Sequence, residues 1–445
     1  MRFSINNLII RGKWISLPAL LLCIVTTSIA KYDFTSQSPW PEIMKERLET
    51  ILPAAMETAN IDAWLVICRE NNNDPLAKHI ACDNAGQTAV FMFYFDKTHK
   101  NEQTERLFKS IAFSPVGEAT SLKDMAVLDD VHPVPRNENA IVFASELIKR
   151  LNFSTVAINM SDEDPQADGI SHTQYKALVR ALGIEYSQRL VSANTLIQEY
   201  LSIKLPVEVD IMKEAAELTA KWQVEAYQQV VVGKTKDSDL ALFLKQKMRE
   251  HGVSDAWAPS QNPNVVSGTD RGHSHATDRI IRHGDIIQID FGIRVFDTWV
   301  TDIQRFAYVL MPNETEVPED IAYYWASAKQ GRKAAFDAML PGATGKDVDS
   351  AQRAVMLATN SKPVMWSTGH PVGYVAHDSG PSLSSTNSNG SKQLKPGMTF
   401  AFDGFHSWIM KNGQAKTISV EEMVVITDTG AEYLIEPQQN LILIK

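Results

Sequence analysis

The chain has 445 residues, enough for two domains with large cores, and its 44% hydrophobic and 22% charged residues describe an ordinary globular protein. The net charge of -10, without a cluster of Lys and Arg, argues against a nucleic-acid-binding protein, because phosphate contacts need clustered cations. The composition does not indicate intrinsic disorder.

The first thirty residues have the pattern of an export signal. Three basic residues precede an apolar run over residues 14–25, and Ser28 and Ala30 are small residues at the positions that a signal peptidase reads. The run is shorter than the roughly 20 residues that span a bilayer, which favours a cleaved signal over an uncleaved anchor. We therefore expect a signal peptide over residues 1–30, a periplasmic or secreted protein, and no stable membrane association after cleavage.

Beyond the signal, alternating patterns indicate an α/β N-terminal domain over residues 31–205. Helical spacing occurs over residues 44–59 and 173–183. Strand-like apolar runs occupy residues 63–67, 89–95, 140–145 and 155–160. Pro206 then begins a long amphipathic helix, so we place the domain boundary there and expect a second domain over residues 206–445.

Two cysteines, Cys68 and Cys82, lie in the first of these domains. In an oxidising compartment the pair could form a disulfide, and two free buried thiols are the alternative. A pair is too few for a metal site built from cysteines.

Residues 286–310 read as two strands that each carry a carboxylate, Asp290 and Asp302. Alternation puts Asp290 and Gln288 on the polar face of the first strand. A hairpin centred near Phe296 would set the two acids opposite each other, with Cβ atoms roughly 5 Å apart. Such acids need a shared proton or a divalent cation between them. The alternative is two unrelated surface acids.

Three more polar residues sit on or beside strands in the last eighty residues: His370, Asp403 and Glu421. Alternation places Asp403 and Glu421 on the faces opposite to apolar neighbours, whereas Glu422 falls on the apolar side and is the weaker candidate. Four acids and one imidazole suit Mn, Co, Zn or Fe better than an ion that prefers thiolate ligands.

Five motifs in order, "GDIIQIDFG", "TDIQR", "GHPVGYVAH", "PGMTFAFD" and "SVEEMVVIT", resemble those of the pita-bread metallopeptidases, which include methionine aminopeptidase, aminopeptidase P, prolidase and creatinase. The resemblance covers roughly residues 206–445, and the preceding α/β domain matches the aminopeptidase P and prolidase branch. It implies an α+β protein, in which a curved antiparallel sheet with covering helices follows the α/β N-terminal domain.

The resemblance also implies a metal centre with two divalent ions, manganese being the first choice. Asp290 would chelate one ion, Asp302 and Glu421 would bridge both, and His370 and Asp403 would complete the second. A hydroxide held between the ions would attack the N-terminal Xaa-Pro bond of a peptide substrate, because two cations lower the pKa of bound water and stabilise the oxyanion.

Two further histidines take roles from the same resemblance. His377 matches the histidine that steadies the intermediate, and His273 matches the one that contacts substrate near the leaving group, with His275 as the fallback. The alternative for each is a structural, hydrogen-bonded histidine. The family resemblance also allows a homodimer.

The sequence departs from the family pattern at three places that bear on the site, and in minor ways at Pro371 and Asp378. Asp290 and Asp302 are twelve residues apart where the family has eleven, so we expect a bulge or a longer hairpin loop. Asp403 stands in place of Glu, which retracts the carboxylate by one methylene. Ser419 replaces an Arg that could bind a carboxylate bidentately. Prolidase-like recognition of a dipeptide's free C-terminus is therefore disfavoured.

Three hypotheses follow. The leading one is an exported dinuclear-metal peptidase that hydrolyses N-terminal Xaa-Pro bonds. The second is a metal-free hydrolase of the creatinase type, in which histidine does acid–base work and Asp290→Ala leaves activity intact. The third is a binding protein of the same fold whose hydrolysis is impaired by Asp403 and Ser419.

Overall fold

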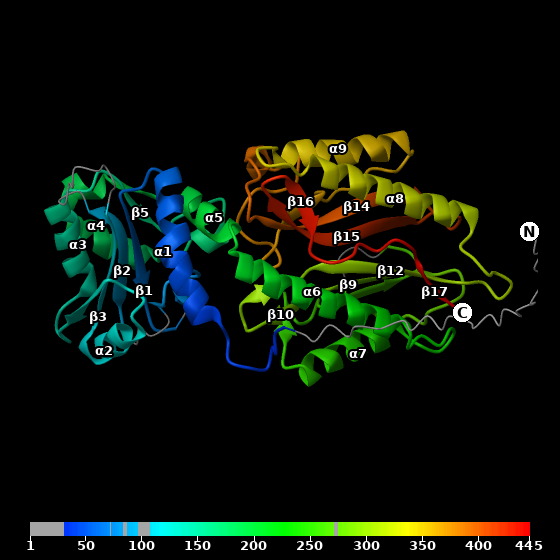
Figure 1. The fold of residues 1–445 in the computed structure, drawn as a ribbon, viewed down its shortest axis with the longest axis horizontal. Helices are drawn as coiled ribbons and strands as arrows, with labels where there is room; N and C mark the ends of the chain where they lie inside the picture. Colours follow the sequence, from blue (N-terminus) through cyan, green and yellow to red (C-terminus); the bar gives the residue numbers. More distant parts are fainter. Residues whose placement is uncertain (1–30, 72, 83–86, 97–106, 271–274) are drawn as a thin grey trace, which may run out of the picture. The chain divides into compact units, whose positions relative to one another are not determined.

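A computed structural model describes residues 31–445 apart from positions 72, 83–86, 97–106 and 271–274 (Figure 1). The chain divides into two compact units, Met1–Lys31 and Tyr32–Lys445. The expected signal peptide lies outside the described residues, and the boundary at Pro206 stays a prediction because it falls within the second unit. Within the described part of the chain, no helix has the length and apolar character that crossing a membrane requires.

A six-stranded mixed sheet forms the first half of this unit, with strand order β4-β3-β2-β1-β5-β6. The pairs β1/β2 and β2/β3 are antiparallel, and the other neighbours are parallel. Its strands are β1 Ala63–Cys68, β2 Ala89–Asp96, β3 Leu107–Pro115, β4 Asp130–Val134, β5 Val156–Ile158 and β6 Leu190–Ser192.

Both faces of this sheet are covered, as an α/β arrangement requires. Along β1, Trp64 and Val66 join one core cluster together with side chains of α1 and α5. Leu65 and Ile67 join another with side chains of α3 and α4. The helices are α1 Trp40–Thr58, α2 Val116–Met125, α3 Ala140–Leu151, α4 His172–Ser187 and α5 Asn194–Ser202, and 3-10 turns span Ala77–His79 and Pro165–Ala167.

One predicted strand is wrong: residues 140–145 are the first half of α3. The side chain of Asn139 accepts a hydrogen bond from the backbone N–H of Ile141 at 2.9 Å and so caps the start of the helix. The helix ends at Leu151, and the next residue, Asn152, has the left-handed conformation that terminates many helices. A run of six mostly apolar residues is too short to separate a buried strand from the apolar face of a twelve-residue helix.

The structure joins Cys68 and Cys82 in a disulfide, with Cα atoms 6.2 Å apart, and thereby decides between the two alternatives. It ties the end of β1 to the segment after the Ala77–His79 turn.

Replacing both cysteines with alanine is expected to lower the free energy of unfolding by about 3 kcal/mol, because the crosslink closes a short loop in the unfolded chain. Urea titrations of the double variant and of the reduced parent protein measure this, and the two curves should coincide. Equal midpoints for the variant and the oxidised parent would contradict a stabilising crosslink.

The second half contains two four-stranded sheets, ordered β17-β12-β9-β8 and β13-β14-β15-β16, and a small sheet ordered β11-β10-β7. The strands are β7 Ser254–Asp255, β8 Asn264–Ser267, β9 Ile286–Phe291, β10 Ile293–Val295, β11 Trp299–Val300, β12 Ile303–Val309, β13 Gly369–Pro371, β14 Thr399–Ile409, β15 Ala415–Thr427, β16 Gly430–Tyr433 and β17 Ile442–Ile444. The helices are α6 Pro206–Tyr227, α7 Asp237–Glu250, α8 Glu319–Ala338 and α9 Gly345–Ala358, with a 3-10 turn at Ser388–Ser391.

Helices cover one side of each four-stranded sheet. In Figure 1, α6 runs along β9 and β12, while α8 lies against β14 and β15 with α9 packed beside it. From α6, the Tyr227 hydroxyl donates to the Arg305 carbonyl at 2.6 Å, and Gln223 donates to the Ile303 carbonyl at 2.8 Å. Phe400 and Phe402 of β14 pack in the core with α8 side chains. The opposite strand faces carry the polar residues described next.

Candidate metal centre

The β9–β12 hairpin positions the first two acids. Phe296 and Asp297 form its turn with φ values of 50° and 53°. The strands pair Asp290 with Gln304, so the prediction that Asp290 lies opposite Asp302 is wrong by two residues. The cause is the position of the turn. The paired residues of the two strands are symmetrical about Asp297, one residue beyond the predicted centre, and each one-residue shift of the centre moves the partner of Asp290 by two residues. A side-chain hydrogen bond nevertheless joins the two acids diagonally.

The other three candidate ligands come from the second four-stranded sheet. Asp403 of β14 is the cross-strand partner of Glu421 of β15. His370 lies on the neighbouring short strand β13, opposite Ala401. In antiparallel partners the side chains leave the same face of the sheet, so the pairing directs both acids to one side, where His370 also projects.

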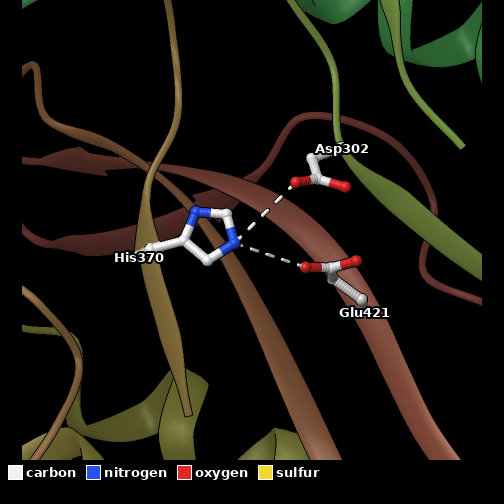
Figure 2. A group of neighbouring side chains, drawn as sticks. All are labelled: Asp302, His370 and Glu421. Carbon is white, nitrogen blue, oxygen red and sulfur yellow. Dashed lines mark ion pairs between the residues drawn. The ribbon is translucent and has the colours of Figure 1, made fainter. Parts of the chain in front are cut away.

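Asp302, His370 and Glu421 form the tightest group (Figure 2). One ligand atom from each lies within 4.8 Å of the others. The Nε2 atom of His370 is 3.8 Å from Oδ2 of Asp302 and 3.9 Å from Oε1 of Glu421. Ligand atoms from β13, from β15 and from the residue just before β12 thus point toward one position.

Burial and mutual repulsion shape the electrostatics of the site. Burial raises the pKa of Asp290 to about 7. It raises the pKa of Asp302, Asp403 and Glu421 well above the usual range, and neighbouring carboxylates add to the shift of each. Four carboxyl groups that are buried together disfavour one another's ionisation unless a cation lies between them.

The donor set fits a divalent cation. Oδ1 of Asp403 and Oε2 of Glu421 are buried and accept no hydrogen bond from any residue that the structure describes. Buried carboxylates are normally paired with a cation or coordinate a metal. Carboxylate oxygens with one imidazole nitrogen suit hard to intermediate ions such as Mn, Co, Zn and Fe.

The three predicted histidines have different outcomes. The ring of His377 lies 4.2 Å from that of His370, centroid to centroid, at 89°. His273 lies outside the described residues. His275 is exposed and is not among the described residues that line the site.

All five candidate ligands and His377 line one cleft with a volume of about 790 Å³. Its walls also include Trp257 and Met365, and Asp164 from the 3-10 turn region of the N-terminal half. A cleft of this size accommodates a short peptide or a comparable ligand.

Comparison with known protein families gives the same assignment as the motifs. Residues 210–428 match the model of metallopeptidase family M24. The chain carries an M24 metallopeptidase domain. It is therefore a metallopeptidase, and the family expectation is confirmed.

Two curated relatives of this M24 peptidase are archaeal. An Xaa-Pro dipeptidase of Pyrococcus furiosus is 27% identical over 250 residues, which are 56% of this chain and 67% of the relative. An Xaa-Pro dipeptidase of Pyrococcus horikoshii is 26% identical over 288 residues, covering 60% of this chain and 77% of the relative.

Solved structures show the same fold at low identity. The X-Pro aminopeptidase from Thermotoga maritima superposes with a TM-score of 0.65 at 19% identity, covering 88% of this chain and 100% of that one. The prolidase from Pyrococcus horikoshii gives a TM-score of 0.62 at 19% identity, with coverages of 89% and 100%. The expected fold, a pita-bread domain preceded by an N-terminal domain, is confirmed.

Glu422 has a structural role in this M24 peptidase, as its position on the apolar side suggested. Its two carboxylate oxygens pair with Arg305 and Arg332, each at 3.0 Å, and the side chain is fully buried. Arg332 comes from α8, so this ion pair fixes β15 against the helix that covers it. Glu421, one residue earlier, faces the cleft instead.

Several residues of the site escaped the sequence analysis. Gln304 hydrogen-bonds Glu421 and accepts a hydrogen bond from Ser419 at 2.7 Å. Asp349 of α9 accepts one from Thr368, two residues before His370, at 2.6 Å. Spacing of two from Asp302 was the available signal for Gln304, whereas nothing near Asp349 marks it.

Proposed function

We propose that this M24 peptidase hydrolyses the N-terminal Xaa-Pro bond of peptides in the periplasm or outside the cell, using two divalent metal ions, manganese first among them. The observation that supports it best is the convergence of Asp302, His370 and Glu421 in the cleft, with Asp290 and Asp403 beside them. The names of the Pyrococcus relatives supply the Xaa-Pro substrate. The export signal pattern supplies the location.

The five candidate ligands would share the task of holding the metal ions. Asp290 and Asp302 from the hairpin, with His370, Asp403 and Glu421 from the other sheet, hold the ions. Such ions lower the pKa of bound water and polarise the scissile carbonyl.

The histidines act on the substrate. His377, beside His370, donates a hydrogen bond to the carbonyl oxygen as negative charge builds on it. By the family resemblance, His273 would contact the substrate on the leaving side.

The test starts with elemental analysis of the purified protein and an assay on Ala-Pro-Ala with added manganese or cobalt. We expect bound metal, release of alanine, and loss of activity after chelation that returning manganese restores. The His377→Ala variant should keep its metal and lose most of the rate. If the protein binds no metal and does not cleave Ala-Pro-Ala with manganese or cobalt, the proposed function is wrong.

A second candidate is a binding protein with impaired hydrolysis. The observation that favours it is the shortened side chain of Asp403, which lies outside the group within 4.8 Å. In that case Asp403→Glu, which restores one methylene, should raise the rate by at least tenfold and the metal content toward two ions per chain. An active parent protein with two bound ions would rule this candidate out.

A further inference from the structure

The loop between β13 and β14 carries His377 at the cleft. Residues 376 and 378–380 are buried, whereas His377 is exposed and lines the cleft. The backbone N–H of Asp378 donates to the Pro371 carbonyl at 3.0 Å, so the chain turns back on itself here. The orientation of the His377 ring therefore depends on its buried neighbours rather than on burial of the ring itself.

The side chain of Asp378 holds this loop together. It is fully buried, and its Oδ2 atom accepts from the Tyr374 backbone N–H at 2.9 Å and lies 3.3 Å from Nζ of Lys204. Its Oδ1 atom accepts from the Ser379 backbone N–H at 2.9 Å and from the Gln166 side-chain amide at 3.0 Å. A carboxylate has about four acceptor positions, and these four donors occupy them. Because a buried carboxylate is costly without partners, each donor helps to keep the loop in one arrangement.

The N-terminal half supplies part of this network from the 3-10 turn that begins after Asp164. Asp164 caps the turn, because its Oδ1 atom accepts from the Gln166 backbone N–H at 2.9 Å. Its Oδ2 atom accepts from the Ser379 hydroxyl at 2.6 Å. The Gln166 side-chain amide donates to Asp378 and to the Ser379 hydroxyl, each at 3.0 Å. One capped turn thus binds the two residues that directly follow His377.

We propose that Gln166 is a positioning residue for the reaction. Through Asp378 and Ser379 it holds His377 in the orientation in which the ring donates to the substrate carbonyl. The inference rests on the proposed function and adds to it a residue of the N-terminal half. Gln166 is not among the described residues that line the cleft, so it acts on the reaction through the loop. The N-terminal half is then part of the catalytic apparatus and not only a wall of the cleft.

Loss of this positioning should lower kcat and leave KM nearly unchanged. A donor that meets the carbonyl oxygen as charge builds on it stabilises the transition state more than it stabilises the bound substrate. A displacement of about 1 Å is enough to cost such a group much of its effect. The Gln166→Ala variant removes the hydrogen bonds to Asp378 and Ser379 and replaces no described residue of the cleft walls.

The first experiment measures hydrolysis of Ala-Pro-Ala by the manganese-loaded protein. We expect Gln166→Ala to lower kcat by at least about tenfold, with KM and metal content within about twofold of the parent protein. Gln166→Glu has the same length but cannot donate when ionised, so its kcat should fall at least as far. Gln188→Ala, at an exposed position just after α4 in the same half, is the control and should match the parent. A parental kcat in either Gln166 variant would overturn the proposal.

A double variant separates positioning of His377 from general damage to the protein. Once His377 is replaced with alanine, Gln166 has no catalytic ring left to position. The double variant should therefore be as slow as His377→Ala alone, within about twofold. If the two losses multiply instead, Gln166 affects the rate by another route and the proposal fails.

A measurement that needs no hydrolysis distinguishes this proposal from the proposed function. Nuclear magnetic resonance of protein with isotope-labelled histidine, with zinc added because its d shell is filled, gives the ring signal of His377, which is identified by its loss in His377→Ala. We expect this signal to shift or broaden in Gln166→Ala and to stay in place in Gln188→Ala. If it does so but the parent protein cleaves no peptide, the peptidase assignment fails while the positioning stands. If peptides are cleaved and the signal stays in place in Gln166→Ala, the positioning fails alone.

Discussion

Asp302→Asn is expected to weaken manganese binding by at least ~100-fold and to reduce peptide hydrolysis by a similar factor or more, since changes that only touch a ligand's outer partners already cost 10–100-fold. Asp302 lies among three other candidate ligands. It lies 3.8 Å from His370, hydrogen-bonds Asp290, and is repelled by the charge of Asp403. Metal binding is measured by calorimetry and hydrolysis on Ala-Pro-Ala.

The same variant should change stability in opposite directions with and without metal. In the metal-free protein an amide avoids the cost of burying or protonating one of the four crowded carboxyl groups at neutral pH and can donate to Asp290, so the melting temperature should rise. Because the variant binds metal weakly, the increase that manganese gives the parent protein should disappear. Asp297→Asn, at the exposed turn of the same hairpin, is the matched control and should behave as the parent does. A variant that keeps the manganese-induced increase would show that Asp302 is not a ligand.

Arg47→Met is expected to lower the free energy of unfolding by about 3–5 kcal/mol, because it leaves the buried carboxylate of Glu208 without its cation. The two side chains are fully buried and 2.6 Å apart. Glu208 also accepts hydrogen bonds from Trp299 at 3.0 Å and from the Tyr374 hydroxyl at 2.6 Å. One ion pair thus connects α1, α6, the hairpin and the loop between His370 and His377. Urea titration gives the midpoint shift.

The double variant with Arg47→Met and Glu208→Gln is the control for this prediction. It removes both charges, so it should recover part of the loss, and a double variant no better than the single one would contradict the ion-pair argument. Burial opposes ionisation of Glu208, yet the charge of Arg47, together with hydrogen bonds from Tyr374 and the Leu205 backbone and the charge of Lys204, outweighs it and holds the pKa of Glu208 below its usual value. The contribution is therefore complete at neutral pH and is lost only as acid takes the solution down through that lowered pKa.

The sequence was sufficient for the local features of the site because strands have a fixed period of two. Alternation placed Asp403 away from Phe400 and Phe402, and the structure has the two rings in the core. It also separated Glu421 from Glu422, which the structure puts on the cleft side and in the ion pairs with arginine respectively. The role of each candidate ligand remains a prediction that the metal measurements test.

The sequence predicted less well which residues of different elements lie next to each other. The hairpin register depended on which residues formed the turn, and a shift of one position at the turn changed the partner of Asp290 by two residues. The helix over residues 140–151 was misread as a strand because its apolar side was judged over half its length. Whether Cys68 and Cys82 are bonded depended on their distance in space.

The sequence by itself determined the family, the order of the candidate ligands and the faces of their strands, because motif spacing and two-residue alternation are properties of the chain alone. Only the tertiary structure decided that the cleft walls come from both halves of the chain, that Lys204 and Lys416 are engaged with Asp378 and Asp270, and that Ser419 donates a hydrogen bond to Gln304. These contacts join residues more than a hundred positions apart, and no local pattern in the chain encodes which distant charge will be neutralised by which.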